Sequence, residues 1–337
     1  MRILFIGGTG TISMAITRLL ASQGHEIYLL NRGSRNHELP ENVRTITADI
    51  GNEEETAKKL DGMTFDCVGE FIGFVPQQLE RDFRLFNGKT RQFIYISSAS
   101  AYQKPLKGYV ITEETPLENP YWEYSRNKKA CEEYLFERYK KDGFPVTIVR
   151  PSHTYDERSV PLGVHGNGGS WQVVKRIKEG KPVIIHGDGT SLWTITHNSD
   201  FAKGCAGLVG NEKAIGEAFH ITSDETVPWN DIYRAIADAL GSELKPYYVS
   251  SQMLADLSDY DYVGSLIGDK ANSVLFDNSK IKSLVPDFKA EISAWDGIHM
   301  TVRYILEHPE YQNEDAEFDS WCDKVIEKIE SISAGAI

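Results

Sequence analysis

Residues 1–13 read MRILFIGGTGTIS, and this stretch decides the predicted fold. Residues 2–6 form a short apolar run, which is typical of a fully buried parallel strand. Three glycines within residues 7–10 then interrupt the pattern. Apolar residues recur at helical spacing from Ile12, and Gly24 is placed to end that helix. The chain is therefore predicted to begin with a strand, a glycine turn and a helix, whose unpaired N–H groups would stabilise an anionic pyrophosphate.

Strand-like and helix-like patterns alternate along the rest of the N-terminal half. Apolar runs predict strands, and amphipathic patterns with capping residues predict helices. The predicted strands cover residues 26–30, 43–48, 65–71, 92–98 and 145–149, and the predicted helices cover residues 52–60, 76–86 and 122–141. Such alternation is typical of an α/β fold with a doubly wound parallel sheet, the Rossmann architecture, joined by right-handed crossovers.

The pattern becomes less regular after residue 151. Helices are predicted at 170–179, 199–209 and 228–240, short strands at 183–186, 218–222 and 247–250, and a mainly helical tail at 295–337. We therefore predict a dinucleotide-binding Rossmann domain from residues 1–151 and part of 182–222. Residues 152–337 are predicted to form mainly a smaller, mixed substrate-binding lobe and the tail, over the carboxyl ends of the sheet, where such folds bind ligands.

Composition excludes several classes of protein. The 337 residues are 41% hydrophobic and 25% charged, as in soluble globular proteins. No apolar run of about 18 residues suggests a membrane span, and no leader precedes the first strand, so a cytoplasmic protein is predicted. The four cysteines lack metal-binding spacing, so no metal site is predicted. The net charge of −13 argues against an extended nucleic-acid surface.

Tyr124 and Lys128 form the single Tyr-x-x-x-Lys pattern of the chain. With sixteen tyrosines about one such match is expected by chance, so its position matters more than its spacing. The pair lies on the helix predicted between the fifth and sixth strands, where residues four apart share one face. A phenol with a pKa near 10 is a poor base at neutral pH, and a nearby ammonium lowers that pKa. Ser97 and Ser98 end the fifth strand and add hydroxyl groups at the same edge.

Together these features resemble the extended short-chain dehydrogenase/reductases, also called the NAD-dependent epimerase/dehydratase family, in an atypical form. The resemblance extends over about residues 1–285 and includes the Arg-Pro pair at Arg150. It implies that Tyr124 is the acid/base, that Lys128 is its electrostatic partner and that Ser98 holds the substrate oxygen. It also implies a homodimer, formed through two helices of each subunit.

The resemblance further implies that the chain binds NAD or NADP. A carboxylate at the end of the second strand would accept hydrogen bonds from the adenosine ribose and repel a 2′-phosphate, but Asn31 and Arg32 occupy this place. Asn31 can bond a free ribose and Arg32 can bind a phosphate, so both cofactors remain alternatives. The implied cofactor contacts are Gly7, Gly10, Thr11, Ile12, Asn31, Arg32, Asp49, Ile50, Ser97, Lys128 and Pro151.

Departures from the family pattern bear on the reaction. Ser13 replaces the third glycine of the turn. Trp193 stands where nucleotide-sugar enzymes of the family have an arginine that binds the diphosphate, and an indole can instead stack on a sugar or belong to the core. Ala99 and Ser100 stand where 4,6-dehydratases have an Asp-Glu pair, which favours an epimerase or a reductase over a dehydratase. We expect a small, sugar-like substrate, with Ser100, His153 and Trp193 as candidate contacts.

Other functions remain open from the sequence. Residues 31–33 and 69–73 also resemble the branch that includes the chloroplast stem-loop-binding proteins, so a non-catalytic or RNA-associated member is one alternative. A redox-sensing scaffold that binds the cofactor without turnover is another. The acidic net charge counts against RNA, and the intact Tyr-Lys pair counts for catalysis. We therefore predict an NAD(P)-dependent enzyme that oxidises or reduces a secondary hydroxyl or ketone, and we regard nucleic acid and membranes as improbable partners.

Overall fold

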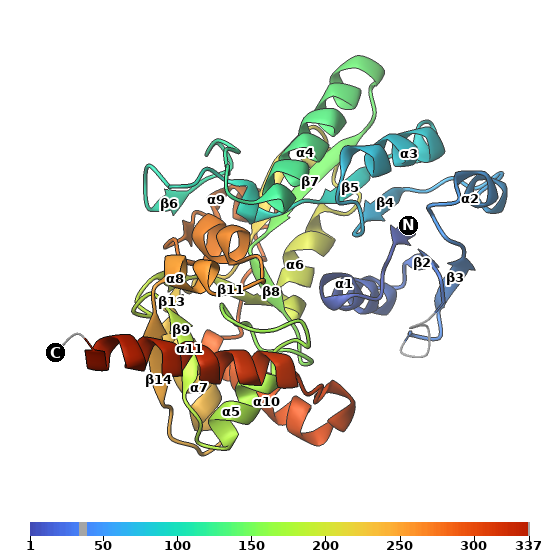
Figure 1. Ribbon diagram of the computed structural model, residues 1–337. Helices are drawn as coiled ribbons and strands as arrows, with labels where there is room; N and C mark the ends of the chain where they lie inside the picture. Colours follow the sequence, from blue (N-terminus) through green and yellow to red (C-terminus); the bar gives the residue numbers. More distant parts are fainter. Residues whose placement is uncertain (34–38, 336–337) are drawn as a thin grey trace.

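A seven-stranded parallel sheet organises the N-terminal half of the computed structural model, which describes residues 1–33 and 39–335 (Figure 1). The strands lie in the order β12-β7-β5-β4-β1-β2-β3, and all neighbouring pairs are parallel. They are β1 (Arg2–Ile6), β2 (Glu26–Asn31), β3 (Val43–Thr47), β4 (Cys67–Glu70), β5 (Phe93–Ile96), β7 (Val146–Pro151) and β12 (Ala218–Ile221). The chain runs outward from β1 to β3 and returns to β4 on the other side of β1. This doubly wound topology confirms the predicted fold class.

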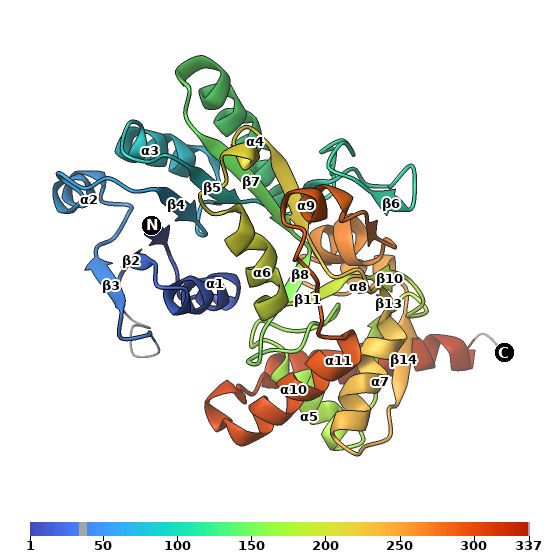
Figure 2. The same cartoon turned by 180° about the vertical axis from the view of Figure 1, so that it is seen from behind.

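Helices cover both faces of this sheet (Figures 1 and 2). They are α1 (Thr11–Ser22), α2 (Glu53–Lys59), α3 (Pro76–Phe86), α4 (Glu123–Asp142) and α6 (Asn198–Leu208). Helix α1 packs beside α6, and α3 packs beside α4. Each pair therefore closes one face of the sheet.

Strand β1 divides its side chains between two hydrophobic clusters. Ile3 and Phe5 pack with residues of α1 and α6, whereas Leu4 and Ile6 pack with residues of α3 and α4. All four side chains are at most 2% exposed, because successive residues of a strand point to opposite faces. Burying each side chain of this size stabilises the fold by about 1.5–3 kcal/mol. The opening strand is thus the centre of both layers.

The glycine turn after β1 is held in place by hydroxyl groups of α1. Gly7 and Gly8 adopt φ angles of +101° and +74°, which side chains other than glycine rarely tolerate. The Oγ atom of Ser13 accepts the N–H of Gly10 at 2.9 Å, and the hydroxyl of Thr17 donates to the carbonyl of Gly8 at 3.1 Å. Ser13, which replaces the family's third glycine, therefore contributes a cap while it stays buried.

Predicted helix boundaries agree with the structure where a capping residue marks them. Asn52 precedes α2 and accepts the backbone N–H of Glu55 at 3.2 Å, as the predicted capping box requires. Gly143 ends α4 in the left-handed conformation with φ +70°.

Most of the remaining elements follow β7 and form a second lobe and short connections (Figure 2). The helices are α5 (Trp171–Lys178), α7 (Trp229–Ala239), α8 (Ser251–Asp256), the π-helix η4 (Val263–Lys270), α9 (Ser279–Leu284), α10 (Ala294–Glu307) and α11 (Ala316–Gly335). The strands pair as β8 (His153–Tyr155) with β11 (Ile195–His197), β9 (Val183–His186) with β14 (Pro246–Val249), β10 (Leu192–Trp193) with β13 (Val227–Pro228), and β6 (Val110–Ile111) with β15 (Leu275–Phe276).

Residues 182–222 contribute to both parts of the molecule, since β12 joins the main sheet while β9 pairs with β14 outside it. Several elements were not predicted, among them η4, α8, α9 and the strands of two or three residues. Strands this short are defined by distant partners and carry no readable periodicity. Within residues 1–33 and 39–335, no helix is long and apolar enough to span a lipid bilayer.

Candidate active site

A groove of about 630 Å³ lies at the carboxyl ends of the central strands, where α1 begins. We call it the cofactor groove. Its wall contains eight of the predicted cofactor contacts, namely Gly7, Gly10, Thr11, Ile12, Asn31, Arg32, Asp49 and Ile50. The amino terminus of α1 supplies free N–H groups and the positive end of the helix dipole, both of which favour a bound phosphate.

The predicted adenosine end of the groove contains Asn31 and Arg32. The Oδ1 atom of Asn31 accepts the N–H of Gly33 at 2.8 Å and thereby shapes the turn after β2. The side chain of Arg32 is exposed. A guanidinium in this position is available to a 2′-phosphate, and the absence of a carboxylate at residue 31 removes the usual repulsion.

A buried acidic network supports the unusual end of β4. Glu70 is fully buried, and its carboxylate accepts the backbone N–H of Ile72. Arg81 lies 3.8 Å from Glu70 and 2.8 Å from Asp82. Burial, together with the neighbouring Asp82, raises the pKa of Glu70 well above its usual range. Because Arg81 and Ile72 also line the cofactor groove, this network shapes a wall that sequence reasoning did not resolve.

Lys128 joins the ends of two strands from inside the protein. It is 2% exposed, and its Nζ atom donates to the carbonyl oxygens of Gly73 and Ile96, each at 2.8 Å. The ammonium also lies 4.8 Å from the ring centre of Tyr95 and 5.7 Å from that of Tyr124. Burial lowers the pKa of Lys128 to about 8. Its charge is therefore positioned by the backbone beside the predicted acid/base.

Tyr124 extends from the first turn of α4 toward a chain of hydroxyl groups. Burial raises the pKa of its phenol, and the neighbouring Ser98 hydroxyl lowers it. The hydroxyl of Ser98 lies 2.9 Å from that of Ser100, which in turn accepts the Ser125 hydroxyl at 2.9 Å. The ring of Tyr124 packs against Trp122 at 5.0 Å between centres. The predicted catalytic residues are thus brought together at one place.

A second hollow, of about 330 Å³, adjoins these residues, and we call it the substrate pocket. The predicted residues in its wall are Ser98, Ser100, Tyr124, Pro151, His153 and Trp193. The pocket residues that the sequence did not single out include Lys104, Trp122, Asp269, Lys270, Val274 and Phe276. They come from the loop after β5, from the start of α4, from η4 and from the region of β15, so only the folded chain brings them together.

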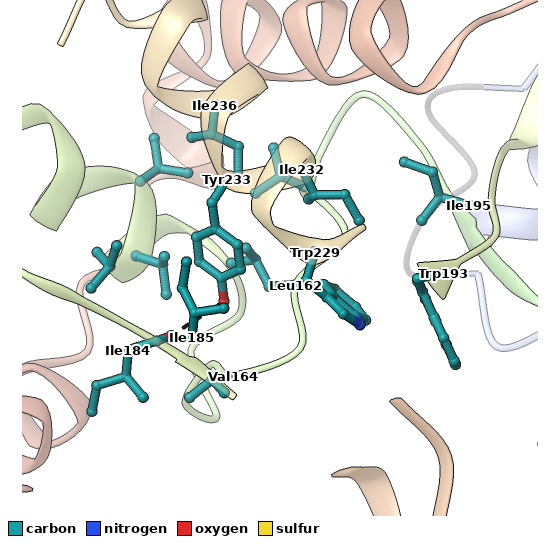
Figure 3. Packing of buried hydrophobic residues seen from close by; sticks show 14 of the residues in the cluster. Leu162, Val164, Ile184, Ile185, Trp193, Ile195, Trp229, Ile232, Tyr233 and Ile236 are labelled. Atoms are coloured by element: carbon teal, nitrogen blue, oxygen red, sulfur yellow. Dashed lines mark hydrogen bonds between the residues drawn. The ribbon is translucent and has the colours of Figure 1, made fainter. Parts of the chain in front are cut away.

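Trp193 and His153 form a fixed pair in the pocket wall. Trp193 is 3% exposed and stacks on Trp229 at 5.5 Å between ring centres, side by side at the edge of a hydrophobic cluster (Figure 3). Its indole N–H donates to Nδ1 of His153 at 3.1 Å. Burial, with a smaller contribution from Lys270, lowers the pKa of His153 to about 3. The imidazole is therefore neutral, and its proton resides on Nε2.

Three predicted cofactor contacts, Ser97, Lys128 and Pro151, lie outside the wall of the cofactor groove, and Lys128 lines neither hollow. Ser97 is buried at the end of β5 and lines neither hollow, and within the described residues its hydroxyl has no hydrogen-bond partner. Pro151 lines the substrate pocket rather than the cofactor groove. In the part of the chain that the structure describes, no group of three or more His, Cys, Asp or Glu side chains is arranged to hold a metal ion.

Comparison with known proteins identifies the family. The sequence model of the NAD dependent epimerase/dehydratase family matches residues 3–222. The chain belongs to this family. Membership confirms the predicted family and a nicotinamide dinucleotide as its cofactor, and it agrees with the groove at the amino terminus of α1.

The curated relatives of this chain include proteins with different functions. The chain is 25% identical over 264 residues to 2′-dehydrokanamycin reductase of Streptomyces kanamyceticus, a match that covers 78% of this chain and 74% of that relative. It is 27% identical over 255 residues to chloroplast stem-loop binding protein of 41 kDa b of Arabidopsis thaliana, covering 71% of this chain and 63% of the relative.

Solved structures share the fold. UDP-glucuronic acid 4-epimerase from Bacillus cereus, in complex with UDP-glucuronic acid and NAD, aligns with a TM-score of 0.72 at 20% identity and covers 91% of this chain and 99% of the epimerase. A dTDP-glucose 4,6-dehydratase from Bacillus anthracis in complex with NAD gives the same TM-score at 19% identity, covering 92% and 98% of the two chains.

Proposed function

We propose that this member of the family oxidises or reduces a secondary hydroxyl or ketone of a small, sugar-like substrate with NAD or NADP, as an epimerase or a reductase. The observation that carries the proposal is that the two hollows adjoin at the end of β5. Ile96 lines the cofactor groove, whereas Ser98 lines the substrate pocket together with Tyr124. A cofactor and a substrate would therefore be neighbours at the predicted catalytic residues.

The chain offers separate residues to each part of the cofactor. The glycine turn at residues 7–10 and the amino terminus of α1 would hold the pyrophosphate. Asp49 and Ile50 would hold the adenine, and Lys128 would hold the nicotinamide ribose. When bound, the nicotinamide supplies or accepts the hydride.

Tyr124 would move the proton of the reacting oxygen. Burial raises the pKa of its phenol, so at neutral pH the hydroxyl keeps its proton and is suited to protonate a ketone oxygen. The Ser98 hydroxyl would orient the same oxygen by a hydrogen bond. The ammonium of Lys128 favours the phenolate that remains after the proton has moved.

The pocket residues favour an epimerase or a reductase over a dehydratase. Oxidation followed by reduction on the opposite face would make the chain an epimerase. Ala99 and Ser100 occupy the positions that would supply a carboxylate pair for elimination of water. Ser100 instead bonds Ser98 and Ser125, which supports an orienting role.

A Tyr124→Phe variant tests the proposal. NADH binding, measured by fluorescence titration, should stay within twofold of wild type, while turnover with a panel of keto-sugars and NAD(P)H should fall about 100-fold or more, as expected for loss of a general acid. Tyr121→Phe, at an exposed tyrosine three residues earlier, is the matched control and should keep full turnover. Unchanged turnover in Tyr124→Phe would refute the assignment.

The similarity to a chloroplast stem-loop binding protein supports a second candidate, an RNA-associated member. The net charge of −13 disfavours it. An RNA titration at low salt separates the two, because absence of binding removes the second candidate.

The homodimer and the cytoplasmic location stay predictions. Sedimentation equilibrium of the full chain would measure the first, since a homodimer doubles the chain mass of 37.9 kDa. Fractionation of cells that express the protein would measure the second.

A further inference from the structure

Three charged side chains in the wall of the substrate pocket take no part in the proposed proton transfer. We call Lys104, Asp269 and Lys270 the charged triad. Lys104 follows residues 97–100 at the end of β5, which we call the serine loop, and Asp269 and Lys270 are the last two residues of η4. The Nζ atom of Lys104 lies 4.0 Å from Oδ1 of Asp269, and the two side chains are 1% and 12% exposed. The triad therefore lies in a place that excludes most water.

The backbone around the triad is firmly held. Asn119 donates to the carbonyl of Ser100 at 2.8 Å and to that of Gly268 at 2.7 Å, which ties the end of η4 to the serine loop. The carbonyl of Lys270 accepts the Trp229 indole N–H at 3.0 Å and interacts with a His186 ring nitrogen at 3.1 Å. π-Helices occur frequently at functional sites. The charges are therefore placed by a network of buried hydrogen bonds.

The hydrogen-bonding capacity of the two ammonium groups is mostly unused. Within the described residues, Lys104 Nζ makes one ion pair, whose 4.0 Å separation is too long for a hydrogen bond. Lys270 Nζ makes a long contact of 3.5 Å with the carbonyl of Ser265 and lies 5.6 Å from the ring centre of Trp122. An ammonium has three donors. Several N–H groups therefore remain for a ligand.

The triad also carries an excess positive charge. Two ammonium groups face one carboxylate, and the neighbouring His153 is neutral. Burial lowers the pKa of both lysines and raises that of Asp269, as expected where charges are incompletely compensated. A second negative charge would balance the site and use the free donors.

We propose that the charged triad binds an anionic group, a carboxylate or a phosphate monoester, on the sugar-like substrate. This inference rests on the proposed function, because it names the substrate class of the same pocket. The pocket volume of about 330 Å³ is near the lower end of the range of about 300–1,000 Å³ for small-molecule sites, which suits a single acidic sugar. Lys104 and Lys270 donate to the anion, while Asp269 offsets part of their positive charge.

Calorimetric titration of the NAD-loaded protein tests this inference. The probes are D-glucuronate, D-glucose 6-phosphate and uncharged D-glucose. At least one acidic sugar should bind about tenfold or more tightly than glucose, the size expected for a hydrogen bond to a charged group. The acid that binds more tightly distinguishes a carboxylate ligand from a phosphate ligand. Equal affinities for acidic and neutral sugars, or no binding of either acid, would overturn the inference.

Variants separate a charge effect from damage to the fold. Lys104→Gln and Lys270→Gln should each weaken binding of the acidic sugar about tenfold or more without changing the affinity for NAD. Lys107→Gln, at an exposed lysine of the same loop, should leave it unchanged. Asp269→Asn should tighten anion binding, a result that misfolding cannot produce, and weaker binding in this variant would contradict the inference.

The two proposals can fail separately. The titration measures binding rather than turnover, so its outcome does not depend on the proposed hydride and proton transfer. An anion preference in a protein without turnover would leave the inference standing and refute the oxidoreductase function. Turnover of neutral sugars, with no preference for acidic sugars in the titration, would refute the inference and leave the oxidoreductase function standing.

Discussion

His153 should make the stability of the protein depend on pH in a way that can be measured without knowing the substrate. Its Nδ1 atom accepts the Trp193 indole N–H at 3.1 Å, and burial lowers its pKa to about 3. In the unfolded chain the pKa of histidine is about 6.5. Between these two values the unfolded state binds more protons than the folded state, so the free energy of unfolding falls as the pH decreases.

The magnitude follows from the distance between pH and the unfolded pKa. Each pH unit below about 6.5 costs about 1.4 kcal/mol until the pH approaches the folded pKa. At pH 5 the imidazole of His153 therefore lowers the free energy of unfolding by about 2 kcal/mol relative to neutral pH. His153→Gln removes this contribution and retains a side-chain oxygen that can accept the Trp193 N–H.

Urea unfolding of both proteins at pH 7 and pH 5, followed by circular dichroism, measures the effect. Wild type should lose about 2 kcal/mol more than His153→Gln between the two pH values. The other histidines are common to both proteins, so their titration cancels in the difference. Parallel losses would show that the His153 imidazole is protonated in the folded protein and would refute the argument.

Two further predictions concern stability. Gly8→Ala should lower the free energy of unfolding in urea by about 2–3 kcal/mol, because φ is +74° and the added Cβ would lie 2.5 Å from Cδ2 of Leu29. The control Gly24→Ala, at φ +81° in open space, should lower it by only about 1 kcal/mol, and equal losses in the two variants would contradict the role of the clash. Glu132→Gln should cost about 3–5 kcal/mol, because it leaves Arg150 buried without its partner at 2.6 Å. A drop below 1 kcal/mol by the same measurement would show that the pair is not needed.

The sequence predicted the elements that local signals mark. The apolar run at residues 2–6, the cap at Asn52 and the left-handed glycine at Gly143 each depend on a few neighbouring residues, and the structure agrees with all three. The helical spacing of Tyr124 and Lys128 also predicted that both side chains lie near the end of β5. These features can be predicted from the sequence because they depend on interactions between residues that are close together in it.

Other parts of the site could not be predicted. The carbonyl partners of Lys128 come from the loop after β4 and from the end of β5, and the charged triad joins a loop near residue 104 to a π-helix near residue 270. Contacts between residues so far apart in the sequence leave no periodic pattern in it. For Trp193 the sequence left a core position and a pocket position open. In the structure its ring face stacks on Trp229, and the same indole lines the substrate pocket.

The two carbonyl bonds of Lys128 have a consequence for cofactor affinity. Folding has already stripped the hydration shell from this ammonium and immobilised its four-carbon chain, an ordering that costs up to about 2 kcal/mol for a lysine. If Lys128 holds the nicotinamide ribose as proposed, binding would not have to dehydrate or order this ammonium. The contribution of Lys128 to dinucleotide affinity should accordingly respond little to added salt, as expected for a charge that mobile ions cannot approach.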